Sequence, residues 1–312
     1  MKKNADNRII VVKRSTRLDD LIVRYNTRDQ AKFYVEHLGT SFEDYELEHR
    51  NYYSSLNDVV SQLSAFAKVQ LLDRAYLPNF IFAGTDIVVV VGQDGLVANT
   101  LKYLNGQHTI GINPDPERWD GVLLPFTAAD VSDAVIETIQ KKRVVHDVTM
   151  GRVSLQNGQS LLAVNDFFVG QKTHTSARYQ IFYNGKEERQ SSSGIIVSTG
   201  LGSSGWLRSV LAGASGIMNS LSKKNLSVKQ NPEHAWGTNA LTFSVREPFP
   251  SRTTGTSIVF GKIPAGTSLK IVSQMAENGV IFSDGIEKDY IEFNSGMEAT
   301  ISVADIKGKI VK

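Results

Sequence analysis

The chain has 312 residues, of which 41% are hydrophobic and 21% charged, and its net charge at neutral pH is +2. This balance is that of an ordinary globular protein, long enough for about two domains with substantial cores. So small a net charge gives no support for a nucleic-acid or membrane partner. Because the chain has no cysteine, disulfides, thiolate metal sites and cysteine nucleophiles are excluded. The six histidines are scattered without a helical ligand spacing, so no direct metal motif is present.

The first residues are basic and polar, and the apolar run that follows them, Ile9 to Val12, is too short for the core of a signal peptide. No stretch approaches the roughly eighteen apolar residues of a membrane span. We therefore expect a cytoplasmic protein.

Strand-like and helix-like segments alternate over residues 1–145. An uninterrupted run of β-branched residues predicts a buried strand at 9–12, and further strands are expected at 86–91 and 109–113. Apolar residues near helical spacing predict a helix at 18–38. Further helices are expected at 54–66, which is polar, at 96–104 and at 127–144, whose terminal charges match the helix dipole. This alternation is typical of a domain with a parallel α/β sheet.

From about residue 146 the pattern becomes β-rich. Asn157-Gly158 and Asn184-Gly185 are hairpin dipeptides between apolar segments. Further strands are expected at 242–245, 257–260, 268–272 and 279–282, with one helix at 203–211 between them. We assign residues 146–295 to a second, β-rich domain. We expect the last segment, residues 296–312, to return to the first domain.

The loop Gly92-Gln93-Asp94-Gly95 follows the clearest strand and precedes a helix. Ligands bind at this end of the strands in an open α/β sheet, and glycines beside a helix N-terminus suit a phosphate. Asp94 supplies a carboxylate that could hold a metal ion or accept a hydroxyl proton. A plain strand-to-helix turn explains the loop about equally well, since it is neither a Walker A motif nor a G-x-G-x-x-G fingerprint.

Polar residues also follow other predicted strands. Asn113 begins a loop after the next strand, and Asn165-Asp166 offers an amide and a carboxylate that suit the paired hydroxyls of a ribose. Asp284-Gly285 ends a late strand and is by itself an ordinary turn. Arg178 is a candidate phosphate contact, with a surface residue as the more ordinary reading.

The stretch from Ser191 to Trp206 is the most unusual part of the chain. An apolar strand at 195–197 runs into a loop of Gly, Ser and Thr that opens a helix. Backbone N–H groups and hydroxyls in such a loop can bind phosphate.

Taken in order, these pieces resemble the NAD kinase family. Its members carry a G-G-D-G loop, then G-I-N, an N-E pair, D-G-x-x-x-S-T-P-T-G-S-T-A-Y and a late D-G. The matching stretches here are Gly92–Gly95, Gly111–Asn113, Asn165-Asp166, Gly194–Trp206 and Asp284-Gly285. The resemblance covers roughly residues 84 to 295. The run from Gly111 to Arg118, Ser192-Ser193-Gly194 and Arg246-Glu247-Pro248 look most like the mitochondrial-type branch.

The resemblance implies a Rossmann-like α/β domain followed by a β-sandwich-like domain. It implies transfer of the γ-phosphoryl group of ATP, with Mg²⁺, to the adenosine-ribose 2′-hydroxyl of NAD, and a homo-oligomer, dimer or tetramer. Asp94 matches the proton acceptor. The residues that match NAD-binding positions are Gly95, Asn165, Asp166, Ser204, Gly205, Trp206 and Ser209. Those that match the ATP-phosphate side are Gly92, Gly200, Gly202 and Ser203, while Asn113, Arg178, Ser193 and Asp284 are further candidates.

The chain departs from the family pattern at several positions: Gln93 for glycine, Leu96 for threonine, Asp166 for glutamate, Ser193 for aspartate, and Gly200-Leu201 for Pro-Thr. Two alternatives therefore stay open. The altered acceptor-side residues are compatible with a kinase for another hydroxyl, on a sugar or lipid. The altered loop residues are compatible with a catalytically weak NAD(P)-binding regulatory protein.

Overall fold

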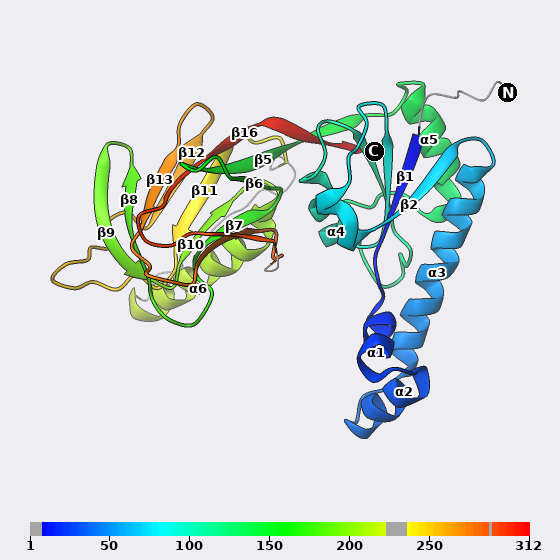
Figure 1. The fold of residues 1–312 in the computed structure, drawn as a ribbon, viewed down its shortest axis with the longest axis horizontal. Helices are drawn as coiled ribbons and strands as arrows, with labels where there is room; N and C mark the ends of the chain where they lie inside the picture. Colours follow the sequence, from blue (N-terminus) through cyan, green and yellow to red (C-terminus); the bar gives the residue numbers. More distant parts are fainter. Residues whose placement is uncertain (1–7, 223–235, 287–288) are drawn as a thin grey trace. The chain divides into compact units, whose positions relative to one another are not determined.

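The computed structural model describes residues 8–222, 236–286 and 289–312 (Figure 1). The chain forms two compact units, Met1–His146 with Lys309–Lys312, and Asp147–Gly308. Unit 1 is a mixed α/β structure around a parallel sheet, and unit 2 is built from antiparallel sheets. The predicted fold class is confirmed.

The sheet of unit 1 consists of parallel strands in the order β2-β1-β3-β4. Their bounds are β1 Arg8–Lys13, β2 Lys68–Asp73, β3 Ile87–Val91 and β4 His108–Ile112. The last strand of the chain, β16 (Glu298–Val311), adds its end to this sheet by pairing with β4 through Lys309 and Ile310. The strand order changes direction at β1, so the edge where β1 and β3 end is a topological switch point.

Helices cover both faces of this sheet. Their bounds are α1 Arg17–Tyr25, α2 Arg28–His37, α3 Glu43–Ser64, η1 Arg74–Asn79, α4 Asp94–Leu101, η2 Ala128–Asp130 and α5 Val131–Ile139. The helices α3 and α5 share one core with alternate residues of the strands, as the burial of Tyr52, Val89 and Val135 shows (Figure 1). Each face of β3 is buried, which explains why its sequence does not alternate.

Helix boundaries differ from the sequence predictions for local reasons. The expected helix 18–38 is two helices, because Asn26 adopts a left-handed φ of 67° and Thr27 caps α2 by accepting a hydrogen bond from the N–H of Gln30. The expected helix 127–144 ends at Ile139, since Lys141 has a φ of 57°. The basic residues 141–143 therefore lie beyond the helix.

Two further predictions were incomplete. The expected helix 54–66 begins eleven residues earlier, at Glu43. Strand β2 was missed because it is an edge strand with mostly exposed side chains, which gives it neither an apolar run nor a clean alternation.

Unit 2 is a sandwich of two antiparallel layers. One layer has the order β12-β11-β10-β7-β14-β15, and the other contains β16-β13-β8-β9 with β5 and β6. The bounds are β5 Val145–Leu155, β6 Ser160–Ala163, β7 Asp166–Gln171, β8 Ala177–Tyr183, β9 Lys186–Ser192, β10 Ile195–Ser198, β11 Ala240–Val245, β12 Phe260–Pro264, β13 Leu269–Ser273, β14 Gly279–Ser283 and β15 Tyr290–Glu292. Inward residues such as Phe167, Tyr179 and Phe243 fill one core between the layers.

The hairpin predictions hold at the turn between β8 and β9, where Asn184 and Gly185 have φ of 50° and 71°. These positive angles at both central residues are those of the turn that Asn-Gly favours. The expected strand 257–260 is wrong for 257–259, since β12 begins only at Phe260.

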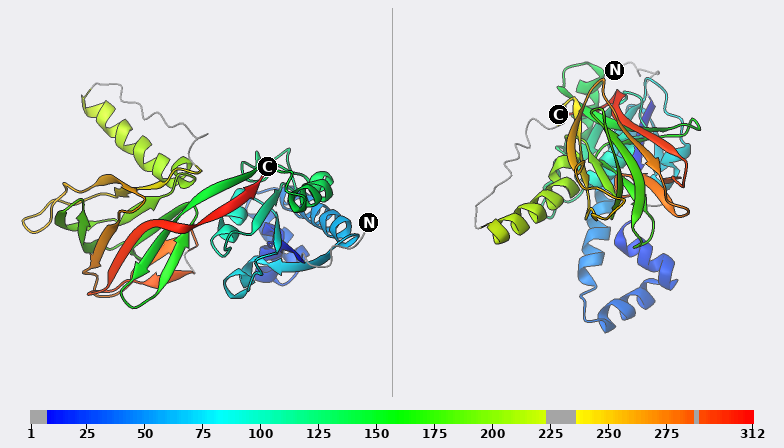
Figure 2. Two further views of the ribbon diagram at one scale, coloured as in Figure 1. Left: turned by 90° about the horizontal axis from the view of Figure 1, so that it is seen from above. Right: turned by 90° about the vertical axis from the view of Figure 1, so that its left-hand side faces the viewer.

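The loop after β10 leads through η3 (Gly202–Ser204) into α6 (Trp206–Ser222), which is longer than expected. Its sole buried residue among those described is Leu207, in the first turn, and Figure 2 shows the helix projecting from the sheet. No described helix is long and apolar enough to span a bilayer.

Candidate functional site

Asp94 is the first residue of α4 and lies directly after the carboxyl end of β3. Its carboxylate accepts hydrogen bonds from the backbone N–H of Leu123 (2.8 Å) and of Val122 (3.2 Å). The side chain is only half-buried. Asp94 therefore fixes the loop that follows β4 and keeps carboxylate lone pairs available at the switch-point edge.

The loop after β4 lies against the same strand ends. A side chain at Gly111 would overlap the carbonyl oxygen of Leu123, so the loop can fold back only over a glycine. The Asn113 amide donates to the carbonyl of Trp119 (2.7 Å), and its oxygen accepts from the N–H of Asp115 (3.0 Å). Asn113, which matches a position of the G-I-N motif, therefore stabilises its own loop in this structure.

The glycines of the 92–95 loop differ in their surroundings. A Cβ on Gly95 would meet no atom within 4 Å, so the backbone there is open to a ligand. A Cβ on Gly92 would lie 2.8 Å from the side chain of Leu96. Leu96 is only 3% exposed, so the residue that replaces the family's threonine packs into the core of unit 1.

One basic segment at this edge was missed from the sequence. Lys13 ends β1, and Arg14 follows it beside β3, where Tyr52 links the Arg14 N–H to the carbonyl of Val91. The Arg14 guanidinium is paired with Glu48 at 2.9 Å. The signal that could have found these cations is their place directly after the first buried strand.

In unit 2, Asp284 binds the Asn165-Asp166 segment. Its carboxylate accepts from three successive backbone N–H groups, those of Val164 (3.1 Å), Asn165 (2.6 Å) and Asp166 (3.3 Å). In return, the Asp284 N–H donates to the carbonyl of Asp166 at 2.9 Å. Asp284 reaches this geometry with a left-handed φ of 55°, and Gly285 follows at 70°. A carboxylate that fixes three N–H groups makes this a rigid junction.

The Gly/Ser/Thr loop packs on the same segment. The Thr199 N–H donates to the carbonyl of Asn165 (2.8 Å), and its hydroxyl donates to that of Val164 (2.5 Å). A side chain at Gly202 would overlap the Asn165 carbonyl. Gly202, a predicted phosphate-side residue, is therefore already required by backbone packing. The structure brings Asn165-Asp166, the 199–202 loop and Asp284 together within one unit.

Asp166 is a buried carboxyl group of this cluster with a perturbed pKa. It is 8% exposed, and burial, reinforced by the nearby charge of Asp284, raises its pKa to about 7. A carboxyl group with such a pKa changes between a proton donor and an acceptor in the neutral range.

This pKa predicts a pH-dependent stability. Between about pH 4 and 7 the folded state keeps the Asp166 proton, whereas the unfolded chain releases it. The contribution of this protonated carboxyl group to the free energy of unfolding is therefore complete below pH 4 and is lost as the pH rises through 7. Between pH 5 and 8 the free energy of unfolding should fall by about 3 kcal/mol more in the wild type than in Asp166→Asn. Urea unfolding of both proteins at the two pH values measures this; parallel pH profiles would contradict it.

The predicted residues at the start of α6 are bonded locally. The hydroxyl of Ser203 donates to the carbonyl of Gly200 (2.7 Å), that of Ser204 to Leu201 (3.2 Å) and that of Ser209 to Gly205 (3.5 Å). These bonds cap and tighten the turn into the helix. Gly205 itself is open, since a Cβ there would approach the protein no closer than 3.5 Å.

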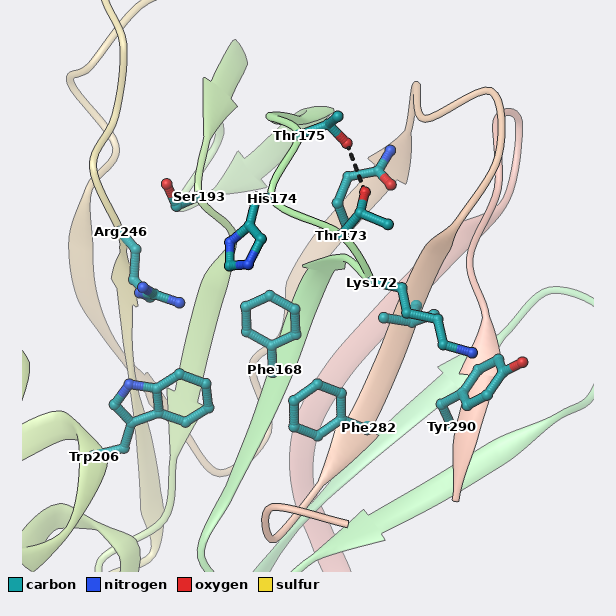
Figure 3. Close-up of a pocket in the computed structure, with 12 residues that line it drawn as sticks. Phe168, Lys172, Thr173, His174, Thr175, Ser193, Trp206, Arg246, Phe282 and Tyr290 are labelled. Atoms are coloured by element: carbon teal, nitrogen blue, oxygen red, sulfur yellow. Dashed lines mark hydrogen bonds between the residues drawn. The ribbon is translucent and has the colours of Figure 1, made fainter. Parts of the chain in front are cut away.

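Trp206 and Ser193 line a pocket on the outer face of the β7 layer, together with Phe168, Phe282, Arg246 and Lys172 (Figure 3). Arg178 is not part of this group. It lies on β8 in the other layer, opposite Ser191 in register, and its side chain is exposed. The candidate phosphate role of Arg178 therefore has no support from its position.

Among the residues that the structure describes, no group of three or more His, Asp or Glu side chains could hold a metal ion. A dedicated protein cage is thus not found in that part of the chain. Mg²⁺ commonly binds through one or two carboxylates together with phosphates and waters, for which such a cage is not needed.

The two units together define a protein with a parallel α/β domain joined to a β-sandwich. Comparison with solved structures finds an NAD kinase from Archaeoglobus fulgidus, in complex with ATP, with a TM-score of 0.56 and 18% sequence identity, covering 98% of this chain and 93% of the other. It also finds yeast NADH kinase, complexed with NADH, with a TM-score of 0.57 and 15% identity, covering 99% of this chain and 84% of the other. No protein-family model and no curated protein matches the chain. The chain therefore has the fold of these kinases over nearly its whole length.

Proposed function

We propose that the protein is a kinase of the NAD kinase type, which transfers the γ-phosphoryl group of ATP to the 2′-hydroxyl of the adenosine ribose of NAD or NADH. The observation that carries this proposal is the junction of unit 2, where Asn165-Asp166, the 199–202 loop and Asp284 converge on a kinase fold. These segments match the family's motifs. Turns that matched the motifs only by chance would not be expected to contact one another in the structure.

The proposed chemistry divides three tasks among the residues that match the family's motifs. The carboxylate of Asp94 accepts the proton of the attacking hydroxyl while that oxygen bonds to the γ-phosphorus and ADP leaves. Asn165 and Asp166 bind ribose hydroxyls, and the residues from Ser204 to Trp206, with Ser209, bind the rest of the dinucleotide. Gly92, Gly200, Gly202 and Ser203 lie on the ATP-phosphate side.

Mg²⁺ belongs to this proposal as the partner of ATP, where it neutralises phosphate charge. Asp94 is the carboxylate of the 92–95 loop that could reach such an ion, and each of its two oxygens accepts one backbone hydrogen bond, from Val122 and from Leu123. The proposal further places the protein in the mitochondrial-type branch of the family, as a homo-oligomer in the cytoplasm.

A single assay tests the proposal. Purified protein is incubated with ATP, Mg²⁺ and either NAD or NADH, and the product is detected with a dehydrogenase specific for NADP or NADPH. We expect product with at least one of the two acceptors. ATP turnover only with a sugar or lipid alcohol would identify the alternative kinase. Measurable NAD binding without any product would identify a regulatory NAD(P)-binding protein and contradict the proposal.

A further inference from the structure

Helix α6 carries a row of apolar side chains along one face, which we call the α6 stripe. Its members recur at alternating intervals of three and four residues, and they are Leu207, Val210, Ala214, Ile217 and Leu221. Leu207, in the first turn, is buried. Further along, the stripe is open, since Ile217 is 63% exposed and Leu221 is 79% exposed. Figure 2 shows this part of α6 projecting from the sheet.

A projecting helix of this sequence is not stabilised by its own residues. It has 17 residues, little more than the roughly 12–15 below which isolated helices are marginal in water. Gly213 and Gly216 weaken it further, and no residue from Ser209 to Ser222 is charged, so no ion pair along the helix supports it. None of the stripe residues after Leu207 belongs to the core between the two layers of unit 2. The stripe therefore requires another surface to pack against.

The stripe is complementary in size to itself when two helices run antiparallel. Larger side chains lie in its C-terminal half and smaller ones in its N-terminal half. A twofold axis between positions 215 and 216 places Ile217 of one copy opposite Ala214 of the other. The same axis places Leu221 opposite Val210. Each larger side chain then packs over a smaller one, as knobs pack into holes. A parallel pair would instead set small residues opposite small ones and leave a gap at position 214.

The flanks of the stripe also suit a second copy. One flank carries Leu211 and Met218, and an antiparallel pair brings this flank of the two copies together. The other flank carries Gly213 and Ser220, which are small enough for a close approach of the two helices. The charged residue of α6 is Arg208, in its first turn, so no like charges meet along the pair and no charge selects a charged partner. Antiparallel helices also set opposite ends of their dipoles side by side.

We propose that α6 is a dimerisation helix, whose stripe packs against the α6 stripe of a second copy of the chain, antiparallel about a twofold axis. A helix of 17 residues is about 25 Å long, so this interface lies at the small end of specific interfaces, near 1,000 Å². We therefore expect a dissociation constant on the order of 1–10 μM. The inference does not rest on the proposed kinase reaction. It assigns the surface that the proposed homo-oligomer leaves open.

The test is sedimentation of the full-length protein over a concentration range of about 1–100 μM, where we expect a reversible equilibrium between monomer and dimer. Ile217→Glu should raise the dissociation constant at least about 100-fold, because each copy would bury an unpaired charge in the interface. The matched control is Ala212→Glu, which adds the same charge at an exposed position on the opposite face of α6. It should change the dissociation constant less than about twofold. Glutamate is a better helix former than isoleucine, so a lower helix propensity cannot explain the loss.

A double variant tests the antiparallel arrangement. In Ala214→Lys/Ile217→Glu, each new lysine faces a new glutamate of the other copy, so the dimer should recover at least about tenfold in affinity over Ile217→Glu. In a parallel pair, lysine would face lysine and glutamate would face glutamate, and the double variant would stay monomeric.

Four results would each overturn the proposal: an Ile217→Glu variant that dimerises like the wild type, an equal loss in Ala212→Glu, a double variant that stays monomeric, or a wild type that is monomeric at every concentration. The last result would mean that another part of the same chain or a different protein covers the stripe. None of these measurements uses the kinase assay, so their failure leaves the proposed function untouched, and an inactive protein that still dimerises through α6 would leave this inference intact.

Discussion

Replacing Asp94 with asparagine should reduce NADP formation by about 10²- to 10⁴-fold, the range lost when a general base is removed. The asparagine oxygen can still accept the N–H of Leu123 or Val122, so the loop after β4 should keep its position. The amide cannot take a proton from the ribose hydroxyl. The rate of NADP formation at saturating substrates measures the loss, and NAD binding by calorimetry should change less than threefold.

The control for this prediction is Asp130→Asn. Asp130 also accepts backbone and side-chain hydrogen bonds at a helix start, from Thr127, but lies in no candidate site. Its variant should keep nearly full activity and lose at most about 1 kcal/mol of stability. If Asp94→Asn is as active as Asp130→Asn, Asp94 serves only as the anchor of its loop, and the assigned chemistry is wrong.

Replacing Asp284 with alanine should have the largest effect on stability. The change removes the acceptor of three N–H groups, at Val164, Asn165 and Asp166, which lie up to 120 residues away in sequence. Leaving buried donors without an acceptor costs about 1–3 kcal/mol each, partly recovered by water, so we expect a loss of about 3–5 kcal/mol. Urea unfolding measures this loss, and hydrogen exchange at the three amides should become much faster.

Two further variants separate the causes. Asp284→Asn keeps one acceptor oxygen and tolerates the left-handed φ of 55°, so it should lose less than half as much stability. It also removes the charge that acts on Asp166, so the pKa of Asp166 should fall toward its ordinary value. Asp305→Ala removes an exposed carboxylate of the same unit and should change stability by less than about 0.5 kcal/mol. If Asp284→Ala and Asp305→Ala lose the same stability, the Asp284 carboxylate does not hold the three N–H groups in the way described.

The fold class and the position of the 92–95 loop were determined by the sequence alone. Runs of β-branched residues are local signals, because a strand buried on both faces needs apolar side chains at every position, as β3 has. The Asn184-Gly185 hairpin is likewise local, since its two positive φ angles depend on those two residues. Strand ends in a parallel sheet share one edge, so the loop's place at that edge followed from chain order.

Only the tertiary structure decided what the site residues do for one another. In the sequence, Asp284 belongs to what looks like an ordinary turn. The hydrogen bond that its carboxylate accepts from the Asn165 N–H depends on two strands, β7 and β14, that come from distant parts of the chain. The need for Gly202 arises from the Asn165 carbonyl, and Gly194, just before β10, leaves room for the ring of Phe168 on β7. Such contacts leave no periodic pattern, because each is a single meeting of residues far apart in sequence. The sequence therefore predicts which residues are unusual, whereas packing determines their partners.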